Sequence, residues 1–526
     1  MKKAIITACL ATIFTLCGCY DDGTTLGNNS VGDIIIGELA DQSVVSYTGT
    51  KLEIAPQVDS DYPESDLTYA WYFYNNGSDT QESGYRENKI ADTKNLDYEV
   101  RLPSGAYTFV FEVTSKSNQY SQTATMNVSV STPFSKGFYI LKETADGQTE
   151  LDFYNGTQSI DLMKQITGQP LSGKPENIAV IYNGEYIDTE TNTPSSGNIL
   201  NICTQDGSYK GFRTEDMKEV LNNTNLFYSG DMPANERPYN FVKSMFLSFY
   251  FSNTGVRYAS LNGELGSDPG SGKLGYPVDN CSSINVQVID YGMNIAYWNN
   301  TSHNIKVIDY NCTMATPLDY YDNTGQLAND AYPSDLECIS SGNNTMGGIT
   351  TTYFLCEQPS SGDRYLFLLT SSMQIDQIIK IDPSTHLAKS KVIAGNGLTA
   401  SYIYCAENDK LYAYSWQTGS EEEVVLPGIT NGEEINYISN QYLNMGMFAD
   451  QSMNFNNLII GTQKDGSYTL YFYHEDDMTG GMPTTEPSEK ISGTGSVKAV
   501  RFLSPIAFTG MEIVSMMDAY PFPTTN

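Results

Sequence analysis

Apolar and polar positions alternate near the C-terminal end of the chain in a pattern that predicts a β-hairpin. Residues 457–474 begin with an apolar segment, pass through Asp465-Gly466, and then repeat large apolar side chains at every other position: Tyr468, Leu470 and Phe472. A period of two is typical of strands with one buried face, and Asp-Gly is a strong signal for a two-residue turn. Two antiparallel strands are therefore expected here.

The same pattern occurs six more times earlier in the chain. The other copies are residues 137–154, 197–212, 247–261, 293–308, 351–369 and 399–416. Seven copies that start roughly 46 to 60 residues apart fall in the period range of propeller blades. Further short apolar segments between the hairpins bring each unit to three or four strands. Residues 132–526 are therefore predicted to form a β-propeller of about seven blades.

A propeller must be closed into a ring, and the chain offers one strand for this purpose. The first hairpin begins almost directly after residue 131, which leaves little room for an inner strand before it. We expect residues 497–503 to fill that place and to pair with the sheet of residues 137–154. Residues 214–222 (TEDMKEVLN) are the exception to the strand pattern and are expected to form a short surface helix.

Residues 33–131 differ from the repeats and are predicted to form a separate β-sandwich. Residues 67–73 (LTYAWYF) place Tyr69, Trp71 and Phe73 on one face of a strand. Short strands separated by turn signals and centred on one tryptophan are typical of a sandwich of about 100 residues. Trp71 is expected in its core. The whole fold is thus predicted to be all-β, a β-sandwich followed by a propeller.

Two of these strands resemble a known family. The YAW strand and PSGAYTFVFEVT at residues 103–114 are similar to PKD-type, immunoglobulin-like domains. Followed by GFYILKETADGQTELDFY at residues 137–154, they resemble the PKD-like family lipoproteins of Bacteroidetes over nearly the whole mature chain. The resemblance implies an accessory role in nutrient capture beside a SusC-type TonB-dependent transporter and a SusD-type lipoprotein. It supplies no catalytic residues.

The N-terminus has the layout of a lipoprotein export signal. Lys2 and Lys3 precede an apolar run too short to span a bilayer, and the run ends in LCGC, which resembles a lipobox. We expect residues 1–18 to be the signal peptide, Cys19 to be lipidated, and residues 19–32 to be the anchor and flexible tether. An ordinary cleaved signal is the alternative.

Asp21 and Asp22 follow Cys19 after a single residue, Tyr20. Acidic residues in this place resemble the surface-export signal of Bacteroidetes lipoproteins. The expected location is therefore the outer membrane, with the protein lipid-anchored and facing the cell exterior.

Composition and charge agree with a folded β-protein and exclude some partners. Hydrophobic residues make up 40% and charged residues only 17%, with 38 Tyr and 44 Gly. The net charge is −33, which repels nucleic acid and disfavours polyanionic substrates. Acidity that simply keeps a crowded surface protein soluble is the plainer interpretation.

The sequence contains no recognisable catalytic constellation. Its three histidines, His303, His386 and His474, lie in different repeats, and no motif for a nucleotide, zinc or serine-hydrolase site occurs. No enzyme activity, cofactor or metal site is predicted. The run His474-Glu475-Asp476-Asp477 offers cation ligands, but a solvated acidic turn is the alternative.

Aromatic residues near loops are the candidates for ligand binding. They are Tyr297, Trp298, Tyr320, Tyr321 and Trp416, which precede turns or lie in a long segment between hairpins. Stacking on a sugar or a peptide side chain is one interpretation, and packing within a blade is the other.

Six cysteines follow Cys19, and one pair of them is a disulfide candidate. Cys312 and Cys338 flank the same long segment between hairpins. Cys203, Cys356 and Cys405 occupy matching positions in different hairpins, too far apart to be bridged, and are expected to be small buried residues.

The leading interpretation is a non-catalytic surface lipoprotein that binds an oligosaccharide or oligopeptide for a SusC/SusD-type import complex. The first alternative is a structural module that assembles this complex without a ligand of its own. The second is a hydrolase or lyase built on a propeller.

Overall fold

The structure is a computed structural model of the whole chain. It describes residues 32–45, 51–76, 85–100, 102, 105–131, 133–189, 192–228, 230, 232–243, 247–260, 271–275, 277–281, 284–290, 295–308, 314–346, 349–370, 372–394, 402–429, 432–443, 455–475, 482–483 and 485–503. The chain divides into two compact units, and the larger one contains Val128–Asn526.

The N-terminal region is a β-sandwich built on one five-stranded sheet. In spatial order this sheet contains β2 (Gln42–Val45), β9 (Ser121–Ser131), β8 (Gly105–Ser115), β5 (Leu67–Asn75) and β6 (Lys89–Ala91). Two-stranded sheets pair β1 (Ile34–Ile36) with β4 (Val58–Ser60) and β3 (Lys51–Ile54) with β7 (Leu96–Glu99), and η1 (Glu64–Asp66) and η2 (Tyr85–Glu87) are single 3₁₀ turns.

Trp71 is a core residue of the sandwich, as predicted. Its side chain is fully buried, and its ring centroid lies 4.6 Å from that of Phe111. The indole Nε1 donates to the Lys94 carbonyl at 3.3 Å, so its polar atom is satisfied inside the core.

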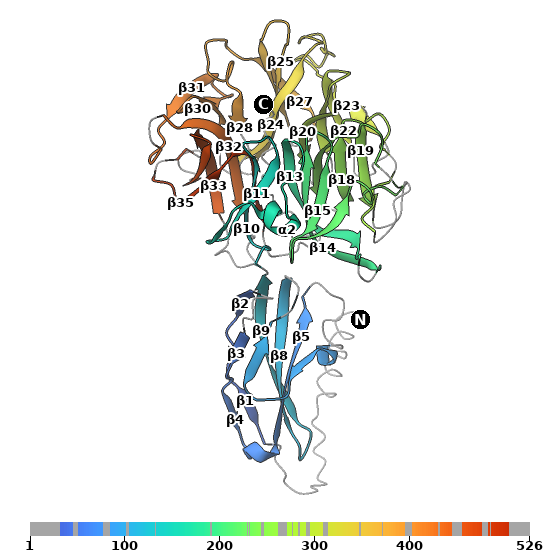
Figure 1. Cartoon of the computed structure of the whole chain (residues 1–526), viewed down its shortest axis with the longest axis vertical. Coiled ribbons are helices and arrows are strands. Elements are labelled where there is room, and N and C mark those ends of the chain that lie inside the picture. Colours follow the sequence, from blue (N-terminus) through green and yellow to red (C-terminus); the bar gives the residue numbers. More distant parts are fainter. Residues whose placement is uncertain are drawn as a thin grey trace, which may run out of the picture. The chain divides into compact units, whose positions relative to one another are not determined.

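The second region is a propeller with seven blades in the described residues, which follow one another in chain order (Figure 1). Blade 1 contains β36 (Ser496–Leu503), β10 (Gly137–Glu143), β11 (Thr149–Tyr154) and β12 (Gln158–Ser159); blade 2 contains β13 (Pro175–Ile187), β14 (Pro194–Thr204), β15 (Tyr209–Arg213) and β16 (Lys218–Asn222). Blade 3 contains β17 (Pro238–Lys243), β18 (Leu247–Ser252) and β19 (Gly255–Ser260); blade 4 contains β20 (Ile284–Asp290), β21 (Ile295–Asn299), β22 (Asn304–Ile308) and β23 (Ala315–Pro317).

The remaining blades have the same order. Blade 5 contains β24 (Glu337–Met346), β25 (Ile349–Glu357), β26 (Arg364–Leu369) and β27 (Ile375–Lys380); blade 6 contains β28 (Val392–Ala394), β29 (Ile403–Glu407), β30 (Lys410–Ser415) and β31 (Ser420–Val424). Blade 7 contains β32 (Glu434–Leu443), β33 (Phe455–Lys464), β34 (Ser467–His474) and β35 (Glu489–Thr494). Each of the seven predicted hairpins forms the second and third strands of one blade, which confirms the repeat.

The β33–β34 hairpin shows why the sequence signal was readable and where it was incomplete. Asp465 and Gly466 both have positive φ, 50° and 75°, as the predicted two-residue turn requires. However, the strand is buried on both faces. Tyr468, Leu470 and Phe472 pack against blade 1, while Tyr471 and Tyr473 pack against blade 6. The expectation of a single buried face is therefore corrected, because neighbouring blades cover both sides of each sheet.

The ring is closed as predicted, by the last described strand. Strand β36 pairs antiparallel with β10, with Gly137 opposite Leu503 and Ile140 opposite Val500. Gln441 of blade 7 binds the backbone of β36, donating to the Val500 carbonyl and accepting from the Phe502 N–H. The two ends of the propeller chain are thus joined within one sheet, and the strands of blade 7 return beside those of blade 1 (Figure 1).

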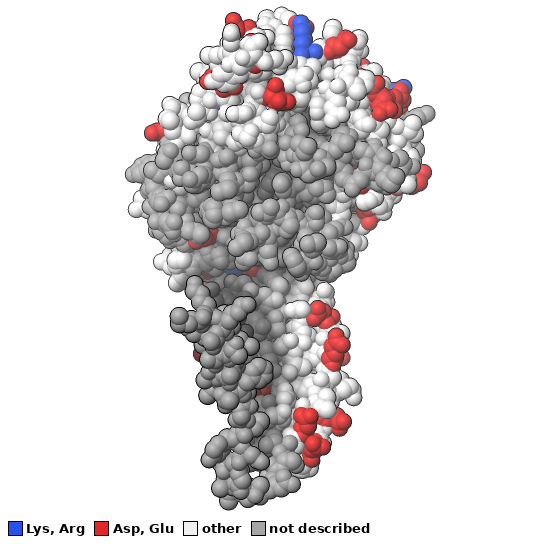
Figure 2. Space-filling model, turned by 180° about the vertical axis from the view of Figure 1, so that it is seen from behind, with Lys and Arg blue, Asp and Glu red and all other residues white. Residues whose placement is uncertain are grey.

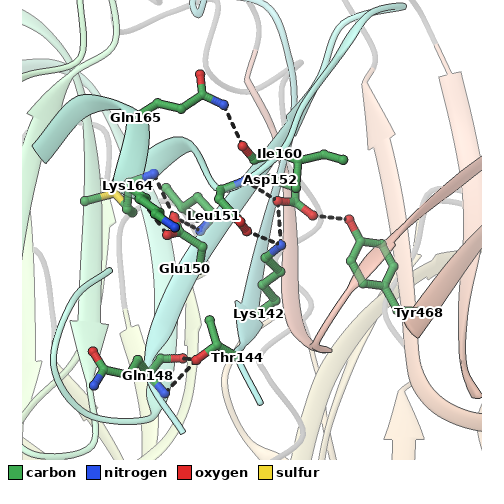
Figure 3. A network of polar contacts seen from close by, with 12 residues as sticks. Lys142, Thr144, Gln148, Glu150, Leu151, Asp152, Ile160, Lys164, Gln165 and Tyr468 are labelled. Atoms are coloured by element: carbon green, nitrogen blue, oxygen red, sulfur yellow. Dashed lines mark hydrogen bonds and ion pairs between the residues drawn. The ribbon is translucent and has the colours of Figure 1, made fainter. Parts of the chain in front are cut away.

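A buried polar network lies at this closure (Figure 3). Lys142 of β10 and Asp152 of β11 are fully buried, and Lys142 Nζ lies 2.7 Å from Asp152 Oδ1. Lys142 also contacts Asp161 Oδ1 at 2.8 Å. Tyr468 of blade 7 donates to Asp152 Oδ2 at 2.6 Å, so this carboxylate links the first and last blades.

A second buried acid, Glu150, supports the short helix α2 (Leu162–Thr167) beside the network (Figure 3). Its carboxylate accepts hydrogen bonds from the N–H groups of Met163 at 2.7 Å and Lys164 at 3.2 Å. Burial raises the pKa of Glu150, and its backbone hydrogen bonds oppose the rise. The carboxylate therefore caps the helix start, where Asp161 makes no side-chain cap.

The predicted helix at residues 214–222 is wrong. Residues 214–217 form a turn with Met217 at a φ of 56°, and Lys218–Asn222 is strand β16, which pairs with β15. Val220 and Leu221 are buried by this pairing, so tertiary packing overrides the local helical pattern. Within the described part of the chain, no helix combines the length and apolarity needed to cross a membrane.

Candidate recognition surface

A hairpin between blades 4 and 5, here called the tip hairpin, comprises residues 319–330. The Asp322 N–H donates to the Gln326 carbonyl at 2.9 Å, and the Ala328 N–H donates to the Tyr320 carbonyl at 2.9 Å. The Asp322 carboxylate accepts from the Thr324 and Gln326 N–H groups at 2.8 and 2.9 Å. These bonds define the turn of the hairpin.

The end of this hairpin carries two apolar side chains in contact with solvent. Tyr321 and Leu327 are bridge partners, and they are 55% and 60% exposed. Met314, in the segment just before it, is 48% exposed. Tyr321 and Leu327 lie opposite each other and form a small apolar surface. Because the hairpin already positions both side chains, binding to this surface costs less conformational entropy.

The base of the tip hairpin is anchored to the propeller. Tyr320 is half-buried and forms a parallel bridge with Ile375 at the start of β27. Tyr332, which follows the hairpin, packs edge-on against Phe367 with ring centroids 5.0 Å apart, and Trp298 contacts the same ring at 5.7 Å. Blades 4 and 5 therefore fix both ends of the segment.

The structure separates the five aromatic candidates. Tyr297 and Trp298 are 0% exposed and belong to the core between blades, which corrects their assignment as ligand-stacking residues. β21 is covered on both faces by neighbouring blades, so neither ring has a surface for a ligand. Trp416 is half-buried against the core of blades 5 and 6, Tyr320 anchors the hairpin, and Tyr321 alone of the five is largely exposed.

Leu327 was missed by the sequence analysis. Single exposed leucines are common and give no signal in sequence. Its position opposite Tyr321 becomes visible only once the turn around Gly325 is known.

The charge around the tip hairpin is negative. Asp319, Asp322 and Asp330 lie within it, and residues 309–335 contain no Lys or Arg. Hydrogen bonds from Thr324 lower the pKa of Asp322, which stays ionised. On the described surface in Figure 2, Asp and Glu side chains are widespread and Lys and Arg side chains lie at few points. A polyanionic ligand is disfavoured at such a surface.

The most enzyme-like contact in the described residues is a histidine–glutamate pair in blade 6, and its geometry is structural. His386 Nδ1 lies 2.8 Å from Glu421 Oε2, and the His386 ring stacks on Tyr412 with a centroid distance of 3.5 Å. The Glu421 carboxylate also accepts the backbone N–H groups of His386 and Leu387. Glu421 thus holds a loop in place.

The thiol beside this pair is not an activated nucleophile. Cys405 Sγ lies 3.6 Å from Glu421 Oε1, but its side chain is 0% exposed. Burial and the nearby carboxylate raise the pKa of Cys405, so the reactive thiolate is suppressed. Cys203 and Cys356 are buried in the same way, which confirms that these three are core residues.

The other predicted chemistry falls partly outside the described residues. Cys19, Asp21, Asp22 and Cys312 lie there, so lipidation, surface export and the Cys312–Cys338 disulfide stay predictions. Cys338 is buried in β24 opposite Cys356 of β25. Across the described ranges, no group of three or more His, Cys, Asp or Glu side chains is placed to hold a metal ion.

A pocket lies between blades 2 and 3 in the described part of the chain. Its volume is about 510 Å³ including the part open to solvent, and its walls are largely apolar, with Ile181, Ile199 and Phe241 among them. Asn201 lines it, but the amide oxygen of Asn201 already accepts from Tyr209 at 2.7 Å. Asn183, Glu185 and Ser248 also lie in the lining, so the pocket combines an apolar wall with a few polar side chains.

The comparisons with known proteins give one family match. Residues 19–175 match the PKD-like family. This segment includes the sandwich and the first strands of the propeller, and it is less than a third of the chain. No curated protein is similar enough to be matched.

Solved structures resemble the chain only distantly. A quinonprotein alcohol dehydrogenase-like protein from Bacteroides thetaiotaomicron is similar over 88% of this chain and 96% of its own, with 12% identity and a TM-score of 0.40. BamB from Moraxella catarrhalis is similar over 68% of this chain and 88% of its own, with 11% identity and a TM-score of 0.31. Neither similarity bears on activity, ligand or partner.

Proposed function

We propose that this protein is a non-catalytic, surface-exposed outer-membrane lipoprotein that serves a SusC/SusD-type import complex by binding an oligosaccharide or oligopeptide. The PKD-like match over residues 19–175 and the lipobox-like sequence ending at Cys19 support the cellular role. The observation that carries the binding role is the rigid tip hairpin with Tyr321 and Leu327 exposed at its end.

The chemistry of the tip hairpin indicates the class of ligand. A tyrosine ring stacks on a sugar face or on an apolar peptide side chain, and Leu327 adds a contact that suits either. The acidic surroundings select a neutral or cationic ligand. We therefore expect neutral glycans or peptides without acidic residues to bind, and polyanionic glycans to be rejected.

A module that assembles the import complex without a nutrient ligand is the second candidate. Exposed Leu327 and Met314 favour it, because aliphatic and thioether side chains are more typical of protein contacts than of sugar platforms. In this case the same hairpin contacts a protein partner.

Calorimetry with the full-length chain, purified in detergent, tests the proposal. Wild type is titrated with neutral glycan and peptide mixtures, and outer-membrane proteins are captured in parallel. Tyr321→Ala is expected to weaken ligand binding about tenfold or more without changing the melting temperature, because it removes an exposed aromatic contact. Tyr228→Ala is the matched control, since Tyr228 is 53% exposed elsewhere on the propeller.

The outcomes separate the candidates. Ligand binding that depends on Tyr321 supports capture, whereas partner binding that depends on Tyr321 with no ligand supports assembly. Equal loss in both variants, or no binding of either kind, would remove the tip hairpin from the proposal. Turnover of any glycan or peptide would overturn the non-catalytic role.

A further inference from the structure

Three polar side chains from neighbouring strands meet on the face of blade 7 that packs against blade 6. Leu458 of β33 lies opposite Asn440 of β32 and Tyr473 of β34, so the side chains of Leu458, Asn440 and Tyr473 lie on one face of the sheet. Asn456 lies two residues before Leu458, and Glu475 lies two residues after Tyr473. Both side chains therefore lie on this same face. The Glu475 N–H donates to the Asn456 carbonyl at 2.9 Å, which continues the pairing past the end of β34.

All three side chains are buried. Glu475 is 2% exposed, Asn440 is 0% exposed and Asn456 is 8% exposed. Asn440 Nδ2 donates to Glu475 Oε1 at 2.5 Å, which joins the first and third strands of the blade across the second. His474 points to the opposite side and is exposed, so it is not part of this cluster.

Only one of the two oxygens of the Glu475 carboxylate has a hydrogen-bond partner among the described residues. No residue in the described part of the chain donates a hydrogen bond to Oε2. The contact to Oε1 comes from Asn440, a neutral amide, and not from a cationic side chain. A buried carboxylate without a positive partner is costly, and either a proton or a metal cation relieves that cost.

We propose that Glu475 Oε2 and the side-chain oxygen of Asn456 bind a hard metal cation of the calcium class between blades 6 and 7. Carboxylate and amide oxygens are the ligands that Ca²⁺ prefers, and the cation supplies the positive charge that no described side chain provides. Asn440 is a positioning residue, because its hydrogen bond holds Oε1 of the same carboxylate.

Calcium titration of the full-length chain, purified in detergent and treated with EDTA, tests the site at pH 7.5. Wild type is expected to show a saturable rise in melting temperature with CaCl₂ and saturable Tb³⁺ luminescence excited through nearby tyrosines such as Tyr404. Glu475→Gln keeps the shape and removes the charge, and it is expected to lower the affinity at least tenfold. Glu434→Gln, on an exposed position of the same blade, is expected to bind like wild type.

A second variant keeps the test decisive if Glu475→Gln does not fold. Asn456→Asp adds a second carboxylate, and a cation site predicts Ca²⁺ affinity about tenfold higher than in wild type. A site without a cation predicts only loss of stability from the added buried charge. Absence of any Ca²⁺ response in wild type, an unchanged affinity in Glu475→Gln, or an equal response to Na⁺ at matched ionic strength overturns the proposal.

Discussion

A buried carboxylate lies at each of the two faces of blade 7, and the two carboxylates differ in the groups that contact them. On the side of blade 1, Asp152 is fully buried and is contacted by Lys142, by the Asp161 N–H and by the Tyr468 hydroxyl. On the side of blade 6, Glu475 is equally buried and is contacted through one oxygen by Asn440.

The difference lies in where the positive charge comes from. Asp152 has an ammonium group from its own sheet, since Lys142 Nζ lies 2.7 Å from Asp152 Oδ1. Glu475 has two amide neighbours, and an amide is neutral. Its burial is tolerated only when a proton or a cation from solution neutralises it. On the blade 1 side the chain itself supplies the positive charge, whereas on the blade 6 side the carboxylate depends on a proton or a cation from solution.

Replacing Lys142 should leave Asp152 buried without a positive partner, as Glu475 is. This change is expected to lower the free energy of unfolding more than the other changes discussed below. Lys142→Met keeps the length of the side chain and leaves Asp152 buried without its counter-charge. The free energy of unfolding is expected to fall by about 3–5 kcal/mol, the usual cost of breaking a buried pair from one side. Urea denaturation followed by tyrosine fluorescence measures it.

Lys174→Met is the matched control for this experiment. Lys174 forms an ion pair with Glu143 at 3.0 Å, but the Lys174 side chain is 58% exposed. A surface pair of this kind contributes about 0–1 kcal/mol. If both lysine variants lose the same stability, the closure network is no more important than a surface pair.

The pH dependence of stability should be the next largest effect, and it belongs to Glu475. The pKa of Glu475 is raised to about 8 in the folded chain, against about 4.3 when unfolded. The proton-linked stability is therefore fully present below about pH 4 and is lost as the pH rises through 8. In EDTA, the free energy of unfolding should fall by a few kcal/mol over this range.

Glu475→Gln should remove this component, so that its stability approaches or exceeds that of wild type at pH 9. Tyr404 of blade 6 faces Glu475, but burial raises the pKa of Tyr404 well above its usual value, and it stays neutral in the range. Parallel pH curves for wild type and Glu475→Gln would mean that Glu475 does not titrate between the folded and unfolded states.

The sequence predicted the seven hairpins and the closing strand, but not the contacts of the two buried carboxylates. Period-two alternation and the Asp465-Gly466 turn identified all seven hairpins, because each hairpin is local. The closing role of residues 497–503 followed from counting strands, and β36 confirms it. For Trp298 the sequence left ligand stacking and packing within a blade open, since a residue before a turn can be exposed, and the structure shows that it is buried.

The buried acids show the same limit. In the sequence, Asp152 lies inside a predicted hairpin and Glu475 lies just after another one. Neither position shows its partner, because Tyr468 and Asn440 lie 316 and 35 residues away. Glu475 was noted only as part of an acidic run with His474. The structure separates the two, because alternation along the strand turns one side chain inward and the other outward.

Two tyrosines on opposite faces of β34 give the finest test of the comparison. Tyr468 donates to the buried Asp152 carboxylate at 2.6 Å, whereas Tyr473 donates to the neutral Pro427 carbonyl at 2.7 Å. A hydrogen bond to a charged group contributes about 1.5–3 kcal/mol, and one between neutral groups contributes about 0.5–1.5 kcal/mol. Tyr468→Phe should therefore destabilise the protein more than Tyr473→Phe in the same urea experiment. In the Lys142→Met background the Tyr468→Phe cost should grow, because the hydroxyl then becomes the principal side-chain donor left to Asp152. An equal cost for the two tyrosines in both backgrounds would mean that the charge on Asp152 does not decide the strength of the closure.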